Sequence, residues 1–248
     1  MTPRTTRSRW RRSPAPPWPR STTTGAAAGR RGSQGWRPRL LRTVDHKIER
    51  GAEQIEEAFE DLPISRLVSG GPGSAVAWDT LSRQGRRNVA TAVRPEQIEQ
   101  VMGEPAVAEP IRMFVGLESA PTKAERVALA LAELERTGAF DRELLMVISP
   151  TGTGYVNYGN IASVTMQYSL RPSPLSLDRV AEGRRQYRML IDAIHNALNE
   201  RPPDKRSRVV LFGESLGAWT SQDAFAHRGT QGLVDAGVDR ALWIGTPT

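Results

Sequence analysis

RVVLFGESLG, residues 208–217, is the stretch that decides the fold. Its first half, Arg208 to Phe212, is an apolar run without polar alternation, which is typical of a strand buried on both faces of a parallel sheet. Its second half, Gly213 to Gly217, fits the pattern G-x-S-x-G with Ser215 at the centre. Because Ala218 to His227 can continue as a helix, the stretch predicts a strand, a sharp turn and a helix.

This order of elements is that of a nucleophile elbow, in which a strained turn lifts a serine hydroxyl above the sheet. Gly213 and Gly217 suit such a turn because it brings backbone against backbone. The helix that follows favours negative charge at its N-terminus. The bare motif also occurs in ordinary Gly-Ser turns, so the strand and helix around it are what favour Ser215 as a nucleophile.

Strand-like and helical segments alternate on the N-terminal side of this stretch and continue after it. Thr122 and Glu125 fit a capping box that begins an amphipathic helix, and Gly138 is placed to end it. This alternation predicts an α/β fold, a mostly parallel sheet of about five strands with helices on both faces. The expected strands are Ile111–Gly116, Leu144–Ser149, Val164–Tyr168, Arg208–Phe212 and Ala241–Gly245, and the longest expected helix is Asp178–Glu200.

Composition divides the chain into three parts. Residues 1–44 hold eleven arginines and no acidic residue, a charge of +11, whereas the remainder holds 23 basic and 27 acidic residues, a charge of −4. Rich in Pro and Gly and without periodicity, the basic part is expected to be a disordered leader. Residues 45–110 are expected to form an acidic helix over 45–61 and an irregular lead-in with one short helix at 95–102. Residues 111–248 are expected to form the α/β domain.

The basic leader leaves other interpretations open. Clustered arginines can neutralise the phosphates of nucleic acid or anionic lipid, a transit peptide shares this composition, and so does a start placed upstream of the true reading frame. We expect no specific nucleic-acid partner. No apolar run approaches the roughly 18 residues of a membrane span, and no secretory apolar segment is present.

The residue types also limit the chemistry. The sequence contains no cysteine, which excludes disulfides, thiolate metal ligands and a cysteine nucleophile. Its three histidines, His46, His195 and His227, are too scattered for a metal-ligand cluster. We therefore expect neither a metal nor another cofactor.

A serine nucleophile needs preorganised donors for the oxyanion of its tetrahedral intermediate. One donor is expected to be the backbone N–H of Leu216, and the second is expected from the loop after the neighbouring strand, at Thr151 or Gly152. A simple flexible turn is the alternative for residues 151–154. A phosphate-binding loop is disfavoured because no lysine follows as in a P-loop.

From Leu144 to Gly245 the sequence resembles the α/β-hydrolase superfamily. More narrowly, from about Ser65 to the end it is similar to the actinobacterial membrane-associated alpha/beta-hydrolase family. The segments that carry this resemblance are SRLVSGGPGSAVAWDTLSRQGRRNVA, PIRMFVGLESAPT, ERVALALAELERTGAFDR, SPTGTG and LFGESLGAW. The resemblance implies a hydrolase domain behind several membrane spans, a cytoplasmic or membrane-associated location and a lipid-like acyl substrate. An arginine-rich leader stands in place of those spans.

The resemblance also implies a triad in the order serine, acid, histidine, with the last two supplied after the final strand of this chain. We therefore expect a partial α/β-hydrolase fold that lacks its C-terminal strands. His227 is expected to point away from Ser215, His195 to be a packed histidine at the edge of an apolar helix stripe, and Glu214 to be a hydrogen-bonding neighbour of Ser215 rather than its base.

These features lead us to expect a serine hydrolase of ester or thioester type, truncated and weakly active, acting on a small-molecule or lipid acyl ester. A catalytically incompetent hydrolase fragment or binding module is the alternative. A protein that binds nucleic acid through its leader is a third, and it predicts a steep dependence on salt.

Overall fold

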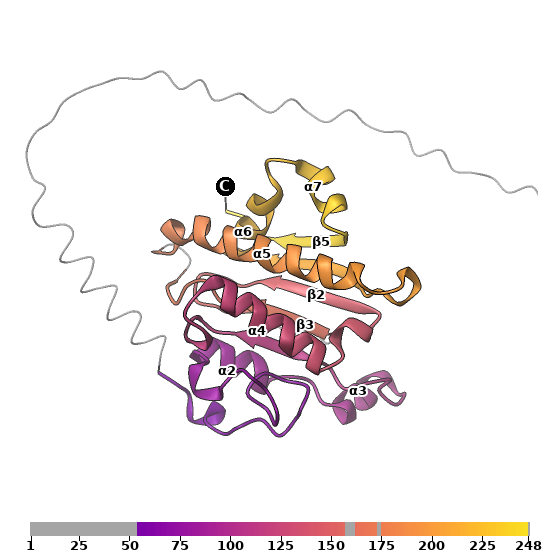
Figure 1. The fold of residues 1–248 in the computed structure, drawn as a ribbon. Coiled ribbons are helices and arrows are strands. Elements are labelled where there is room, and N and C mark those ends of the chain that lie inside the picture. Colours follow the sequence, from indigo (N-terminus) through magenta and orange to yellow (C-terminus); the bar gives the residue numbers. More distant parts are fainter. Residues whose placement is uncertain (1–53, 157–161, 173–174, 248) are drawn as a thin grey trace, which may run out of the picture. The chain divides into compact units, whose positions relative to one another are not determined.

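The computed structural model describes residues 54–156, 162–172 and 175–247. Within them, five parallel strands form one sheet in the order β1-β3-β2-β4-β5 (Figure 1). The strands are β1 Arg112–Val115, β2 Leu144–Ser149, β3 Ala162–Met166, β4 Arg208–Glu214 and β5 Val238–Ile244. The predicted α/β class, with a parallel sheet of about five strands, is confirmed.

Helices cover both faces of this sheet. Figure 1 shows α4 and α5 side by side across one face, with α6 packed next to α5. The α-helices of the described ranges are α2 Arg83–Ala90, α3 Pro95–Met102, α4 Lys123–Arg136, α5 Val180–Asn199, α6 Leu216–Phe225 and α7 Gly229–Asp235.

Strand register shows that α2 lies on the face opposite α6. Gly213 of β4 faces α6, because a Cβ built there would lie 2.8 Å from Ser221 Oγ. Neighbouring residues of a strand point to opposite faces, so Phe212 points away from α6. Through β2 and β3, Phe212 is in register with Phe114 of β1. The ring of Phe114 lies against α2, since a Cβ at Gly85 would be 2.8 Å from it.

The helix boundaries follow from local hydrogen bonds that the sequence encodes. The Thr122 hydroxyl accepts a bond from the Glu125 N–H at 3.2 Å, and the Glu125 carboxylate accepts one from the Thr122 N–H at 2.9 Å. This reciprocal pair is the predicted capping box, and α4 begins directly after it. Gly138 follows the helix with a φ of 66°, a left-handed conformation that glycine adopts without strain.

The lead-in segment before β1 is more ordered than its composition suggests. The predicted short helix is confirmed as α3, but α2 occupies a stretch expected to be irregular. Its first turn is capped by Ser82, whose hydroxyl accepts a bond from the Gly85 N–H at 3.3 Å. Of the acidic helix expected over 45–61, residues 45–53 lie outside the described ranges, as does the whole 1–44 leader, and the rest holds a 3₁₀ turn at Glu57–Phe59.

Backbone pairing also ties the lead-in to β1. The Ser69 N–H donates to the Arg112 carbonyl and the Arg112 N–H donates to the Leu67 carbonyl, both at 3.0 Å. These bonds and the parallel bridge between Val68 and Arg112 extend along the outer side of β1. Val68 and Trp78 belong to the same buried core as the central strands. The lead-in therefore folds as part of the α/β domain.

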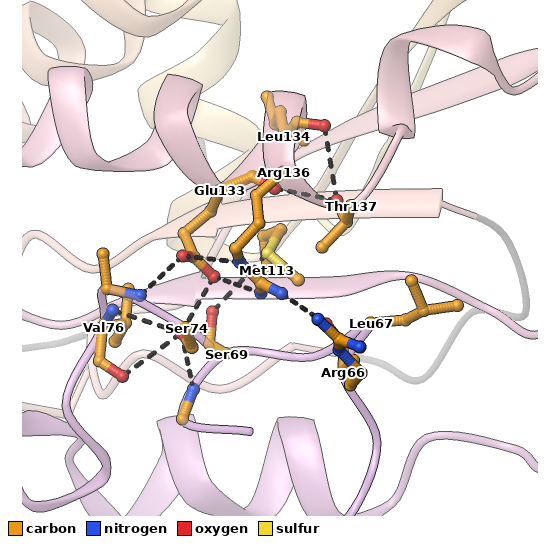
Figure 2. Close-up of polar contacts among 12 residues, drawn as sticks. Arg66, Leu67, Ser69, Ser74, Val76, Met113, Glu133, Leu134, Arg136 and Thr137 are labelled. Carbon is orange, nitrogen blue, oxygen red and sulfur yellow. Dashed lines mark hydrogen bonds and ion pairs between the residues drawn. The ribbon is translucent and has the colours of Figure 1, made fainter. Parts of the chain in front are cut away.

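A buried carboxylate fastens the same segment to α4 (Figure 2). Glu133 is fully buried, and its carboxylate accepts bonds from the Ala75 N–H at 2.8 Å and the Ser74 hydroxyl at 2.9 Å. Arg136 donates to the same carboxylate from Nε at 3.1 Å and from Nη2 at 2.7 Å. It also donates from Nη1 to the Arg66 carbonyl at 2.6 Å. This cluster, Glu133 with Arg136, Ser74 and Ala75, joins residues nearly 60 positions apart in the sequence.

Candidate active site

Ser215 stands at the turn between β4 and α6, where the sequence predicts it. Its φ of 54° and ψ of −124° are unusual, and it is the only non-glycine residue with a positive φ in the described part of the chain. The Ser215 N–H donates to the Ile244 carbonyl of β5 at 2.8 Å, and its own carbonyl accepts from the Trp219 N–H at 3.2 Å. The turn is thus held on one side by the sheet and on the other by the first turn of α6.

Both glycines of the motif are required by close backbone contacts. A Cβ at Gly213 would lie 2.8 Å from the Gly217 carbonyl oxygen and 2.9 Å from the Ala218 Cα. A Cβ at Gly217 would lie 2.1 Å from the Ser149 carbonyl oxygen and 2.7 Å from the Pro150 carbonyl oxygen. Distances this short exclude any side chain, so α6 can approach the end of β2 only because Gly217 has none.

The contact of Gly217 with Pro150 brings the loop of residues 151–154 to the elbow. The loop begins two residues after Ser149, which is in register with Gly213. It forms a tight turn, in which the Gly154 N–H donates to the Thr151 carbonyl at 2.9 Å and the Thr151 N–H donates to the Tyr155 carbonyl at 3.0 Å. Leu216 is the first residue of α6, so its backbone N–H has no carbonyl in a preceding turn of the helix to which it could donate.

A model of the family described as the Alpha/beta-hydrolase family matches residues 111–248, from β1 through β5. The chain belongs to this family. Searches among curated proteins and among solved structures found no match.

The two described histidines of this alpha/beta-hydrolase lie on or next to helices α5 and α6. His195 lies on α5 against Gly237, where a Cβ would be 2.6 Å from its Nδ1, and its Nε2 is 2.8 Å from Asn199 Nδ2. Gly237 directly precedes β5, so His195 lies at the amino ends of the strands, whereas Ser215 follows the carboxyl end of β4. His227 follows α6 and lines a cavity together with Asp192 of α5. Neither of these two described histidines lies at the elbow, and His46 is outside the described residues.

Glu214 is the acidic residue next to Ser215 in the sequence. As the last residue of β4 it is in register with Ile244 of β5, and its side chain is half-buried. Its Oε2 is buried and has no hydrogen-bond partner among the described residues. The hydrogen-bonding role expected for this side chain is therefore not seen at that oxygen.

Gln167 contacts the loop of the candidate site, and the sequence does not reveal it. It follows β3 directly, is fully buried, and donates from Nε2 to the Thr153 carbonyl of the 151–154 loop at 3.0 Å. Its Oε1 accepts from the Ser82 hydroxyl at 2.9 Å. A polar residue at the end of an apolar strand was the available signal, but nothing in its spacing indicates which loop it binds.

Two buried tyrosines, Tyr168 and Tyr187, are held in the neutral form. Burial raises the pKa of Tyr168 to about 12, although the hydrogen bond from Thr220, at 3.3 Å, lowers it in part. Burial also raises the pKa of Tyr187, whose hydroxyl donates to the Val147 carbonyl at 3.0 Å. Neither phenol is therefore a general base near neutral pH.

The described ranges contain no group of three or more His, Asp or Glu side chains that could hold a metal ion. In the same ranges we found no helix with the length and apolar character needed to cross a membrane.

Proposed function

We propose that this alpha/beta-hydrolase cleaves esters or thioesters with Ser215 as its nucleophile. The observation that supports the proposal most strongly is the backbone of Ser215, a non-glycine residue at a φ of 54°. Such a conformation costs about 1–3 kcal/mol and persists where the surrounding structure requires it. Here it is required between Gly213 and Gly217, whose close contacts form the strand-turn-helix of a nucleophile elbow.

In this reaction the Ser215 oxygen attacks the acyl carbon, negative charge develops on the carbonyl oxygen, and the hydroxyl proton leaves with the departing alcohol or thiol. Water then hydrolyses the acyl-serine to the free acid and restores the Ser215 hydroxyl. The Leu216 N–H, at the start of α6, is the first donor that we propose for this oxyanion. The second comes from the 151–154 loop, at Thr151 or Gly152. Because the Thr151 N–H donates to the Tyr155 carbonyl, a contribution from Thr151 would come from its hydroxyl, which lies 3.3 Å from the Thr153 hydroxyl.

The proposed enzyme is weakly active as this chain stands. His195 and His227, the described histidines, lie away from the elbow, so neither is placed to take the Ser215 proton. Serine enzymes that lack part of their triad retain about 10³–10⁴-fold rate enhancement over water from the oxyanion donors and binding. The same placement of the histidines favours the second candidate, a hydrolase fold that binds an acyl compound without turning it over.

The substrate that we propose is a lipid-like acyl ester or thioester. A cavity of about 550 Å³ begins at Trp219, one helical turn beyond Ser215, and extends between α6, α7 and β5. Its aromatic and aliphatic walls would accept an acyl chain. They include Trp219, Phe225, Leu233 and Trp243. An acyl substrate is also what the resemblance to the actinobacterial membrane-associated alpha/beta-hydrolase family implies.

The first test is covalent labelling by a fluorophosphonate, with the modified residue located by peptide mapping. The second is the turnover of nitrophenyl esters whose acyl groups have two or eight carbons. We expect label on Ser215, slow turnover with the longer ester favoured, and loss of both in Ser215→Ala. Ser119→Ala, which removes another partly buried serine, is the control and keeps both. A folded protein that takes no label at Ser215 and cleaves neither ester would favour the binding module.

A further inference from the structure

The side chain of Gln167 links three segments that are distant in the sequence. Its amide nitrogen donates to the Thr153 carbonyl at 3.0 Å, and its amide oxygen accepts from the Ser82 hydroxyl at 2.9 Å. The residue is fully buried, so water does not substitute for either bond. A buried amide with both ends bonded holds its partners in one geometry, since a lost bond leaves a polar group unsatisfied.

The Gln167 backbone is itself fixed by the sheet and by α5. Its N–H donates to the Val115 carbonyl of β1 at 2.9 Å, and its carbonyl accepts from Gln186 Nε2 at 3.0 Å. Gln186 in turn accepts from the buried Arg126 of α4 at 3.0 Å. The backbone of Gln167, from which the amide projects toward the loop, is therefore held in place by β1 and α5.

The loop fits closely around this amide. Gly154 has a φ of 88°, and a Cβ built on it would lie 2.3 Å from Gln167 Nε2. On its other side the loop follows Pro150, whose carbonyl oxygen would lie 2.7 Å from a Cβ on Gly217. The 151–154 loop is thus enclosed between the elbow helix and the Gln167 amide, and a shift of this amide moves the loop relative to Ser215.

We propose that Gln167 is a positioning residue that holds the 151–154 loop where it can stabilise the oxyanion formed at Ser215. This inference rests on the proposed function, because it assigns the loop a part in that reaction. It also gives the lead-in segment a role in the site, since Ser82 orients the amide so that its nitrogen faces Thr153.

The variant that tests this is Gln167→Glu, which keeps the shape of the side chain and an oxygen for Ser82 but replaces the N–H donor. Its carboxylate would face the Thr153 carbonyl and repel it. Loss of an oxyanion donor costs about 10²–10³-fold in rate, so a displaced loop should slow phosphonylation of Ser215 by about 10–100-fold. As the pH falls and the carboxyl gains a proton, it again donates to Thr153, and the rate should recover toward that of the unaltered protein.

Ser207→Ala is the control, because it removes a buried hydroxyl that donates to the Phe140 carbonyl at 2.8 Å just before β4, at the end of the strand away from Ser215, and adds no titratable group. We expect it to lower the thermal midpoint while labelling within about twofold of the unaltered protein, with the same pH dependence. Gln167→Met removes both amide bonds without adding charge and should also slow labelling, without recovery at low pH. Hydrogen exchange over residues 150–156 reports the loop position independently of activity, and it should quicken in both Gln167 variants but not in the control.

Two results separate the possible failures. If the unaltered protein labels at Ser215 and both folded Gln167 variants label at the same rate, the positioning role is wrong and the proposed function stands. If the folded, unaltered protein takes no label, the proposed function falls, and the role of Gln167 in that reaction falls with it.

Discussion

Replacing Glu133 by glutamine should be among the most destabilising single changes in the described part of the chain. The carboxylate is fully buried and accepts four hydrogen bonds, from Ser74, from Ala75 and twice from Arg136. An amide replaces one accepting oxygen by an NH₂ group, which would face donors, and it removes the charge that Arg136 faces. Breaking a buried ion pair by removing one partner typically costs about 3–5 kcal/mol. We expect a loss of that size in the free energy of unfolding.

The assay is urea unfolding followed by circular dichroism. With a slope of about 2.5 kcal/mol/M, the loss corresponds to a midpoint lower by about 1–2 M. Glu135→Gln is the control, because Glu135 lies on the same helix but is exposed, and its bond to Arg201 at 2.6 Å is a surface ion pair. That change should cost less than about 1 kcal/mol. Equal midpoints for the two variants would refute the conclusion that Glu133 fastens the lead-in to α4.

Three further predictions follow from close contacts and burial. Gly217→Ala should lower the thermal midpoint by several degrees and abolish labelling of Ser215, because its Cβ would meet the Ser149 carbonyl at 2.1 Å; an alanine variant that melts and labels normally would contradict this contact. The pKa of Tyr168 is raised to about 12, so its contribution to stability is complete below pH 10 and is lost as pH rises through 12, a change of about 3 kcal/mol. Tyr168→Phe should make unfolding curves measured from pH 10 to 12 less dependent on pH, and an unchanged dependence would place the ionising group elsewhere. Nitrophenyl esters of eight carbons should lose their advantage over two-carbon esters in Trp219→Ala, whereas an unaltered preference would mean that the acyl chain does not enter the cavity along α6.

Much of the sheet could be predicted because its signals are local. Continuous apolar runs mark β2 and the start of β4, and the Thr122 capping box marks the start of α4. The elbow at Ser215 was predictable for a related reason, since its backbone requires glycines at fixed spacings on either side. Periodicity and turn chemistry act over a few residues, which is the range that a sequence pattern displays.

The missed features depend on contacts between distant segments. Helix α2 is short and rich in arginine, and it is stabilised by packing Gly85 on Phe114 of β1, about 30 residues later. Gln167 reaches Thr153, 14 residues earlier, and Ser82, 85 residues earlier. No periodic pattern records such pairings. The basic leader and most of the expected acidic helix remain predictions, since they lie outside the described residues.

The two sides of the sheet differ in how far they are open to strand addition. Along β1 the lead-in already occupies part of the outer side through the bonds of Leu67 and Ser69 to Arg112, whereas β5 has no neighbour beyond it among the described strands. Leu242 and Ile244 of β5 are also exposed, at 54% and 46%. A chain with two open edges could add copies without limit, but one with a single open edge pairs about a two-fold axis and then has none left. Self-association through the open edge of β5 should therefore stop at two copies rather than grow into filaments.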